Sequence, residues 1–370
     1  MKITCTRDAL NSAVSVVSRA VPSRSPNNIL EGIYIKAEKG GKITLTGNDL
    51  QIGIEAIIEG DVLTPGDVVI DAKLLGNIIR TINSDRVSIE VNEHDMTLIK
   101  SGGAKFEIAG LPADGFPGLP VVDAEYSISL PANILRDMVD KTSFAVAQVD
   151  NNPILTGCLL EIKKEGLSMV ALDGFRMAIR NVNMENDFEE RKLIIPEKSL
   201  NELSKIIGDG EELVEINATQ KHAIFMFDNY RMVTRLIEGE FINYNSVIPT
   251  SFSTEIECST HQLTDSVQRA SLIIISDVIK SPVKFNISEG NINISCATTA
   301  GTVDDNIPVE VGDTGLEIGF YNKYLLDVCK VIDTDVVNLQ FNKAVNPLVV
   351  TPTDGNGFLY LILPLRLKAE

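Results

Sequence analysis

The sequence contains no tryptophan, and phenylalanine and tyrosine bring the aromatic share of its 370 residues to only 5%. The cores must therefore rest on isoleucine, leucine and valine, which supply most of the 44% hydrophobic fraction. With 23% charged residues, the composition is that of an ordinary globular protein. A length prior of roughly 100 to 200 residues per domain gives two to four domains.

Histidine and cysteine are scarce and scattered. The three histidines and five cysteines show no paired spacing of the kind that holds a metal ion. An odd number of isolated thiols is typical of a reducing compartment. We therefore expect no metal and no cofactor, and we expect an intracellular, cytoplasmic protein.

Long apolar runs and catalytic motifs are missing as well. No run reaches the ~18 residues of a membrane helix, and the N-terminal MKITCTRDAL lacks the apolar core of a signal peptide. There is no phosphate-binding loop, no Gly-x-Gly-x-x-Gly after a strand, no His-Glu-x-x-His and no Gly-x-Ser-x-Gly. We expect a soluble protein that is not an enzyme.

What the sequence does contain is an internal repeat with a period of about 125 residues. An alternating strand pattern followed by helical i, i+3, i+4 spacing occurs three times, starting with strands at 2–5, 127–130 and 255–258. A second strand-plus-helix pattern follows midway, from Asp67, Lys192 and Leu316. We predict three copies of one domain, with boundaries 1–125, 126–250 and 251–370. Duplication for stability alone is the alternative interpretation.

Alternation of apolar and polar residues elsewhere predicts half-buried antiparallel strands, so the predicted fold class is α+β. Each domain would hold two modules of strand, helix and further strands. Examples of the alternating pattern are 87–91, 223–227 and 291–294. The expected helices span 7–20, 72–82, 131–145, 198–207, 261–275 and 320–331.

Charge is distributed unevenly between these elements. The formal net charge is −18, and each third of the chain is acidic, with 12 basic and 17 acidic, 13 and 19, and 8 and 15 residues. Taken alone, this argues against binding nucleic acid, because phosphates are bound by Lys and Arg. The six expected helices nevertheless carry 11 basic and only six acidic residues.

Six of the basic helix residues recur in register, two in each repeat. The two members of a pair are seven residues apart, which is about two turns and therefore one helix face. A single such lysine would be explained by solubility, but six in register predict a basic surface that binds phosphates without reading sequence. The residues are Lys73, Lys198 and Lys323, and Arg80, Lys205 and Lys330.

Four segments resemble those of a known family. They are LTGNDLQ from Leu45, FEIAGLPADGFPGLP from Phe106, LDGFRMAIR from Leu172, and the C-terminal LYLILPLRL. In their order and spacing the chain resembles, over essentially its whole length, the DNA polymerase III beta subunit family, the sliding clamps. The resemblance implies the DNA-clamp fold, in which two subunits form a head-to-tail ring with sheets outside and helices lining the hole. Its members are non-catalytic processivity factors.

The resemblance also implies a groove for a short partner peptide with Leu and Phe anchors, with Arg176 at its rim. The implied partners are the replicative polymerase alpha subunit, the clamp-loader delta subunit, and repair and translesion polymerases. Phe175, Ile242, Asn245 and Ser246 depart from the family's usual residues, and Lys368–Glu370 extend its usual end. The matching groove positions are Leu155, Leu172, Gly174, Phe175, Arg176, Met177, Ile242, Val247, Leu361, Ile362, Leu363, Pro364, Leu365 and Arg366.

Two further contacts follow from the resemblance. The homodimer interface corresponds to Phe106 and Ile108 in the first domain and to Leu272 and Ile273 in the third. DNA-facing loop positions correspond to Arg24 and to the stretch 148–152, which begins with Gln148.

Two other function classes remain beside a DNA clamp. A repeat-built scaffold that binds proteins and never touches DNA is the first, and the register of basic helix positions disfavours it. An enzyme is the second, and the lack of any recognisable catalytic constellation disfavours that.

Overall fold

The structure, a computed structural model, describes residues 1–120, 126–149, 152–184, 190–274 and 281–367. The tail Lys368–Glu370 lies outside the described residues. Over the described ranges the chain forms six α-helices and 25 strands, and every strand pair of its sheets is antiparallel. The predicted α+β class is confirmed.

The helices lie where the apolar periodicity predicts them. Short 3-10 turns at Ser18–Ala20 and Ser143–Ala145 follow two of them, which explains why the expected ranges 7–20 and 131–145 are longer than the α-helices. The sixth helix is shorter than expected at both ends. The helices are α1 (Arg7–Val17), α2 (Ala72–Thr81), α3 (Ala132–Asp140), α4 (Glu197–Ile206), α5 (Thr260–Ile274) and α6 (Asn322–Cys329).

Local chemistry explains where the first two helices begin. The Thr6 hydroxyl accepts a hydrogen bond from the Ala9 amide at 3.4 Å, and the Asp71 carboxylate accepts one from the Leu74 amide at 2.7 Å. Both are N-caps, which satisfy an amide that has no partner inside the helix. Each helix then buries its apolar stripe, such as Leu10, Ala13, Val14 and Val17 in α1.

The strands form four sheets. The five-stranded sheet, in order β5-β1-β7-β8-β9, contains β1 (Lys2–Thr6), β5 (Asp61–Thr64), β7 (Arg86–Val91), β8 (Met96–Ser101) and β9 (Ala104–Ala109). The first eight-stranded sheet, β10-β15-β16-β17-β4-β3-β2-β6, contains β2 (Gly32–Ala37), β3 (Lys42–Asn48), β4 (Ile52–Glu59), β6 (Gly66–Asp71), β10 (Tyr126–Pro131), β15 (Leu213–Ala218), β16 (His222–Phe227) and β17 (Tyr230–Arg235).

The second eight-stranded sheet, β14-β11-β12-β13-β25-β24-β23-β18, contains β11 (Gly157–Lys163), β12 (Gly166–Leu172), β13 (Arg176–Asn183), β14 (Arg191–Pro196), β18 (Thr254–Ser259), β23 (Val336–Phe341), β24 (Leu348–Pro352) and β25 (Phe358–Ile362). The four-stranded sheet, β21-β20-β19-β22, contains β19 (Val283–Ser288), β20 (Asn291–Thr298), β21 (Gly301–Pro308) and β22 (Leu316–Phe320). The strands predicted at 87–91, 223–227 and 291–294 are confirmed as β7, β16 and β20.

The chain divides into two compact units, Met1–Leu135 with Glu202–Leu236, and Arg136–Asn201 with Ile237–Glu370. These units differ from the three predicted domains because each eight-stranded sheet continues past a predicted boundary. In the first unit β17 pairs with β4, and in the second β25 pairs with β13. The threefold division at 125 and 250 stays a prediction.

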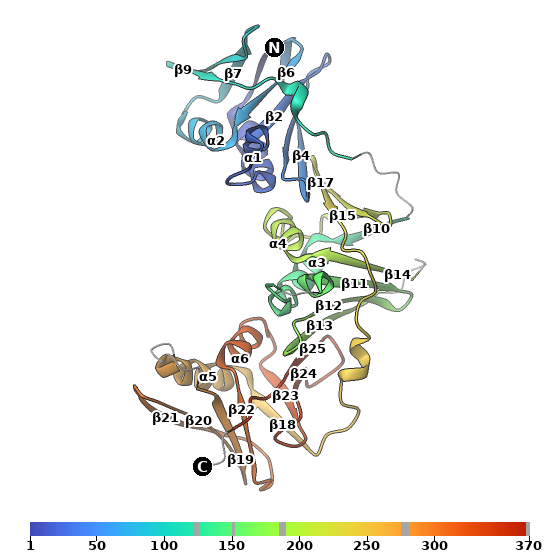
Figure 1. Cartoon of the computed structure of the whole chain (residues 1–370), viewed down its shortest axis with the longest axis vertical. Coiled ribbons are helices and arrows are strands. Elements are labelled where there is room, and N and C mark those ends of the chain that lie inside the picture. Colours follow the sequence, from blue (N-terminus) through green and yellow to red (C-terminus); the bar gives the residue numbers. More distant parts are fainter. Residues whose placement is uncertain (121–125, 150–151, 185–189, 275–280, 368–370) are drawn as a thin grey trace. The chain divides into compact units, whose positions relative to one another are not determined.

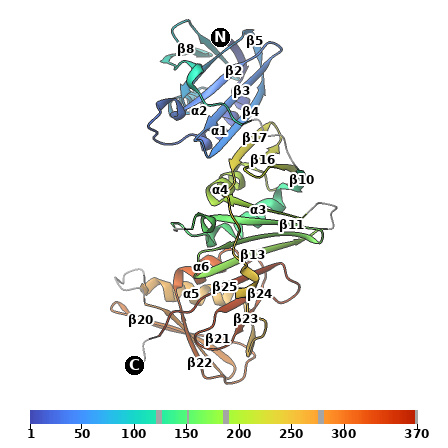
Figure 2. The ribbon, with the colours of Figure 1, turned by 45° about the vertical axis from the view of Figure 1, so that its right-hand side comes forward.

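Within each unit, helices cover sheets. In the first unit α1 and α2 pack together, α1 lies on β3 and β4, and α2 lies on β2 and β6 (Figure 1). In the second unit α5 packs beside α6 and on β20 and β21 (Figure 2). The buried side chains are mostly aliphatic, as a sequence without tryptophan requires. In the described part of the chain, every helix is too short or too polar to cross a bilayer.

Candidate functional site

Two segments that lie far apart in the sequence meet in the second unit. Strands β13 and β25 pair so that Arg176 stands opposite Ile362 and Met177 opposite Leu361. Just beyond the ladder, the Leu363 amide donates a hydrogen bond to the Phe175 carbonyl at 2.8 Å. The expectation that the LDGFRM and LPLRL segments come together is confirmed.

Beneath this junction lies a buried apolar cluster. It contains four of the predicted groove residues, Leu155, Leu172, Met177 and Leu361, which are at most 8% exposed. Tyr244 belongs to the same cluster, and its hydroxyl donates to the Glu161 carboxylate at 2.5 Å. Ile362 is fully buried as well. We call this buried cluster, together with Ile362, the floor.

Solvent-exposed apolar side chains lie on the same chain segments that contribute buried residues to this cluster. Phe175 is 60% exposed, and Ile242 and Val247, which flank Tyr244, are 41% and 53% exposed. Large exposed apolar side chains that cluster mark binding surfaces more often than scattered ones do. We call the following five residues the junction patch: Phe175, Ile242, Val247, Leu363 and Leu365.

A tight turn presents Phe175 to solvent. Gly174 has φ +84°, a backbone conformation that other residues rarely adopt. One oxygen of the Asp173 carboxylate accepts the amides of Phe175 and Arg176 at 2.9 and 3.0 Å. The Leu363–Arg366 segment is held in turn by the Leu365 amide, which donates to the Gly319 carbonyl at 2.8 Å. Pro364 is half-buried and Arg366 exposed on that segment.

Arg176 does not lie at a rim, and that expectation was wrong. Its side chain is only 7% exposed, because two carboxylates neutralise it: Asp173 at 3.0 Å and Asp327 at 2.6 Å. It also donates to the Phe144 carbonyl at 2.6 Å, and its guanidinium carbon lies 4.6 Å from the centre of the Tyr324 ring. A buried arginine is tolerated only with such partners.

Sequence reasoning missed the residues that hold Arg176. Asp173 stands inside the LDGFR segment, so its role could have been suspected from the Asp-Gly turn signal. Asp327 gave no signal beyond being one acid on an otherwise basic helix, since only the fold brings α6 to β13.

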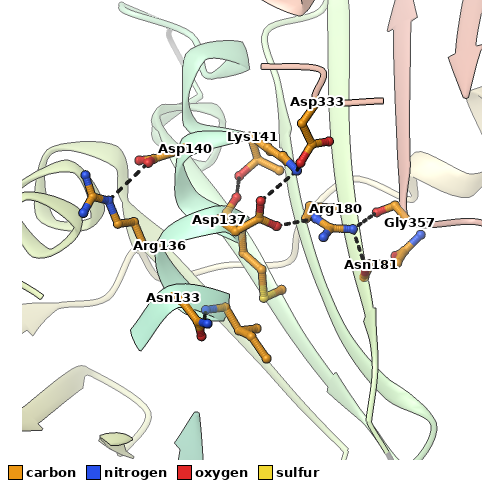
Figure 3. Close-up of polar contacts among 12 residues, drawn as sticks. Asn133, Arg136, Asp137, Asp140, Lys141, Arg180, Asn181, Asp333 and Gly357 are labelled. Atoms are coloured by element: carbon orange, nitrogen blue, oxygen red, sulfur yellow. Dashed lines mark hydrogen bonds and ion pairs between the residues drawn. The ribbon is translucent and has the colours of Figure 1, made fainter. Parts of the chain in front are cut away.

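A second arginine of β13 makes a parallel set of contacts. Arg180 pairs with Asp137 of α3 at 2.6 Å and donates to the Gly357 carbonyl at 2.8 Å. Lys141 bridges Asp137 and Asp333 at 2.7 and 2.6 Å (Figure 3). Residues 137–141, the strand β13 and the turns at 333 and 357 are thereby tied together.

Burial and hydrogen bonding shift the pKa of Glu161 in opposite directions; its carboxylate accepts the hydroxyl of Tyr244, a member of the cluster. Burial raises its pKa, but hydrogen bonds from Tyr244, Lys163 and Lys192 outweigh that effect, so its pKa lies below the usual value. For Tyr244, burial raises the pKa of the phenol, and the bond to Glu161 raises it further. The phenol therefore stays protonated and keeps donating.

The eight predicted DNA-binding residues are all exposed: Arg24, Lys73, Arg80, Gln148, Lys198, Lys205, Lys323 and Lys330. Three of the lysines stand second in α2, α4 and α6. Lys73 and Arg80 line one hollow of about 390 Å³ beside α1, which confirms that they share a helix face. Residues 150 and 151 of the predicted loop stretch lie outside the described residues.

Several of these cations have local partners. The Arg80 guanidinium donates to Asn77 at 2.6 Å, Lys205 pairs with Glu202 at 2.7 Å, and Lys330 lies 3.8 Å from Asp327. Lys330 also follows α6 instead of lying within it, because that helix ends at Cys329. These three side chains therefore have partners within the protein, and the single shared basic surface stays a prediction.

Comparison with known proteins covers nearly the whole chain. Three family models match in order: the DNA polymerase III beta subunit N-terminal domain over residues 1–120, the central domain over 129–243 and the C-terminal domain over 245–366. The chain belongs to the DNA polymerase III beta subunit family.

Relatives and solved structures in this family agree with that assignment. The beta sliding clamps of Halalkalibacterium halodurans and Bacillus subtilis are 34% and 33% identical, over 97% and 99% of this chain and 98% and 100% of theirs. Among crystal structures, a putative DNA polymerase III beta subunit from Eubacterium rectale has a TM-score of 0.95 at 35% identity, covering 99% of this chain and 100% of its own. The B. subtilis clamp has 0.95 at 32%, covering both chains completely.

The residues that the family resemblance assigns to a subunit interface lie at element edges. Phe106 and Ile108 are half-buried on β9, the last strand of the five-stranded sheet. Leu272 is 71% exposed and Ile273 half-buried near the end of α5, which packs on β21, the last strand of the four-stranded sheet. Edge strands present unpaired backbone groups, which suits strand pairing between subunits.

Proposed function

We propose that this beta subunit is a non-catalytic processivity factor. Two copies would close head to tail into a ring that encircles duplex DNA without sequence specificity, and each copy would tether a DNA polymerase through a bound peptide. The observation that carries the proposal is the junction patch, five exposed apolar side chains on three segments that each contribute buried residues to one apolar cluster.

The chemistry of the patch fits a short peptide with apolar anchors. A rigid floor limits what must be ordered on binding, and preorganisation of this kind saves binding free energy. The exposed rim offers aromatic and aliphatic contact area, which is where most of the energy of a small interface resides. Partners of this type would be the polymerase alpha subunit, the clamp-loader delta subunit, and repair and translesion polymerases.

The DNA-binding part of the proposal rests on weak contacts. The exposed cations at equivalent helix positions can interact with phosphates, while the net charge of −18 repels DNA elsewhere. Weak phosphate contacts within a closed ring permit sliding, because topology and not affinity keeps the protein on DNA. A cytoplasmic location belongs to the same proposal, since all five cysteines are buried and unpaired.

A truncation after Ile362 tests the tether. It removes Leu363 and Leu365 from the patch together with their hydrogen bonds to Phe175 and Gly319. Titration calorimetry with the capped peptide acetyl-Ala-Leu-Ser-Leu-Phe-amide should show binding to the full chain and none to the truncated one. Sedimentation should show a dimer in both cases, because the predicted interface residues lie elsewhere. Full peptide affinity in the truncated protein would exclude the patch as the binding site.

Retention on DNA tests the ring and separates it from a scaffold that never touches DNA. After loading onto nicked circular duplex and gel filtration at moderate salt, the protein should stay with the circle. Linearising the same DNA should release it, because a ring slides off free ends. Equal retention on both forms would show binding by contact, and no retention on either would favour the scaffold.

A further inference from the structure

The strand β13 carries two arginines, Arg176 and Arg180, four residues apart and therefore on the same face of the sheet. Each forms an ion pair of 2.6 Å with one aspartate, Arg176 with Asp327 and Arg180 with Asp137. The two pairs are alike in length and in chemistry. They differ in what else the arginine touches.

Arg176 is connected to the turn that presents Phe175. Its Nε binds one oxygen of Asp173 at 3.0 Å, while the other oxygen of Asp173 holds the amides of Phe175 and Arg176 itself. The Phe175 carbonyl then accepts the amide of Leu363. Any displacement of the guanidinium is therefore transmitted through one carboxylate to both Phe175 and Leu363, two members of the junction patch.

Arg180 has no such connection among its described contacts. It binds Asp137 and the carbonyls of Asn181 and Gly357 (Figure 3). In the ladder of β13 and β25, Arg176 stands opposite Ile362 at one end and Arg180 opposite Phe358 at the other. Loss of the Asp137 carboxylate would therefore destabilise the fold without changing the hydrogen bonds of the turn at Phe175.

We propose that Asp327, on α6, is a positioning residue for the peptide site, an inference that rests on the function proposed above. Its carboxylate supplies one of two negative charges around a guanidinium that is 7% exposed. Without that charge, Asp173 alone must neutralise Arg176, and a buried cation with one carboxylate draws that carboxylate toward itself. Asp173 then holds the Phe175 and Arg176 amides less well, so the turn loosens and the rim of the patch is no longer preformed.

The test compares Asp327→Asn with the matched control Asp137→Asn. Each substitution keeps the size of the side chain and removes the charge that faces one arginine of β13. Each also removes the charge near one lysine, Lys330 at 3.8 Å from Asp327 and Lys141 at 2.7 Å from Asp137. Calorimetric titration with acetyl-Ala-Leu-Ser-Leu-Phe-amide should show a dissociation constant raised roughly three- to tenfold in Asp327→Asn and unchanged in Asp137→Asn. Both variants should show a lower midpoint of thermal unfolding.

Amide hydrogen exchange gives a local readout, because an amide that exchanges by local opening responds to its own hydrogen bond, while general destabilisation accelerates only the amides that exchange by global unfolding. Exchange at Leu363 should accelerate in Asp327→Asn and not in Asp137→Asn, because only the former loosens the Phe175 carbonyl. Should Asp327→Asn fail to fold, Asp327→Glu keeps the charge but lengthens the side chain that pairs with Arg176, and it should weaken peptide binding in the same direction while Asp137→Glu leaves peptide binding unchanged.

Two outcomes overturn the inference. Equal weakening of peptide binding by both aspartate variants would make Asp327 a stability residue only, and unchanged binding in Asp327→Asn would remove its role. A wild-type protein that does not bind the peptide would instead refute the proposed peptide site itself, and with it this inference.

Discussion

Truncation of Phe175 should weaken peptide binding without weakening the fold. An aromatic side chain presents roughly 200 Å², so with 60% of it exposed about 120 Å² of Phe175 is open to a ligand. Complete coverage of that area is worth about 3 kcal/mol at ~25 cal/mol per Å², and half coverage about 1.5 kcal/mol. Phe175→Ala should therefore raise the dissociation constant of the peptide about tenfold.

The fold should tolerate this change, because the floor beneath Phe175 is packed without it. We expect the free energy of unfolding to fall by less than about 0.5 kcal/mol, as for other exposed positions. The matched control is Leu63→Ala, which truncates a side chain that is 69% exposed on β5 of the five-stranded sheet. Calorimetric titration and urea unfolding measure both quantities. Unchanged peptide affinity in Phe175→Ala, or an equal loss in Leu63→Ala, would refute the reasoning.

Three further predictions address the interface, the DNA and the buried carboxylate. Leu272→Asp should turn the dimer into monomers in sedimentation velocity, since a charge placed in an apolar contact costs several kcal/mol; an unaltered sedimentation coefficient would disprove the interface assignment. Charge reversal of the lysines that stand second in α2, α4 and α6 should shorten retention on circular duplex of any sequence, and unaltered retention at low salt would show that they do not face DNA. Because the folded pKa of Glu161 is lowered, its contribution to stability is present above the unfolded pKa of about 4.3 and lost as pH falls through the folded value. Glu161→Gln should therefore unfold at lower urea than wild type at pH 7, with the gap closing as pH falls below the unfolded pKa and through the folded one; a gap independent of pH would contradict this.

Secondary structure could be predicted largely from the sequence because its signals are local. The stripe Leu10, Ala13, Val14 and Val17 in α1 repeats at helical spacing, and β7 and β16 alternate with period two. The ends of elements were less accurate: α6 stops at Cys329, so Lys330 lies beyond it. A helix end depends on how the last carbonyls find partners, and that depends on the surrounding fold.

The site could be predicted in part. The family resemblance brought LDGFRM and LPLRL together, and the pairing of β13 with β25 confirms it. The burial of Arg176 could not be predicted, because the side chain of a charged residue next to an exposed phenylalanine is ordinarily expected to be solvent-exposed. Its burial depends on Asp327, which is 151 residues away in the chain.

The sequence by itself determined the α+β class and the positions of the helices and most strands, because caps and periodicity act within a few positions of the chain. Tertiary structure decided which side chains around the turn at Asp173 and Gly174 are available for binding. Met177 faces the buried cluster while Phe175, two residues earlier and before the strand begins, stays 60% exposed. Nothing in the two residue types distinguishes them. The difference arises because Met177 lies within the ladder of β13 and β25, whereas Phe175 lies in the turn before it, where Asp173 accepts its amide and Gly174 has φ +84°.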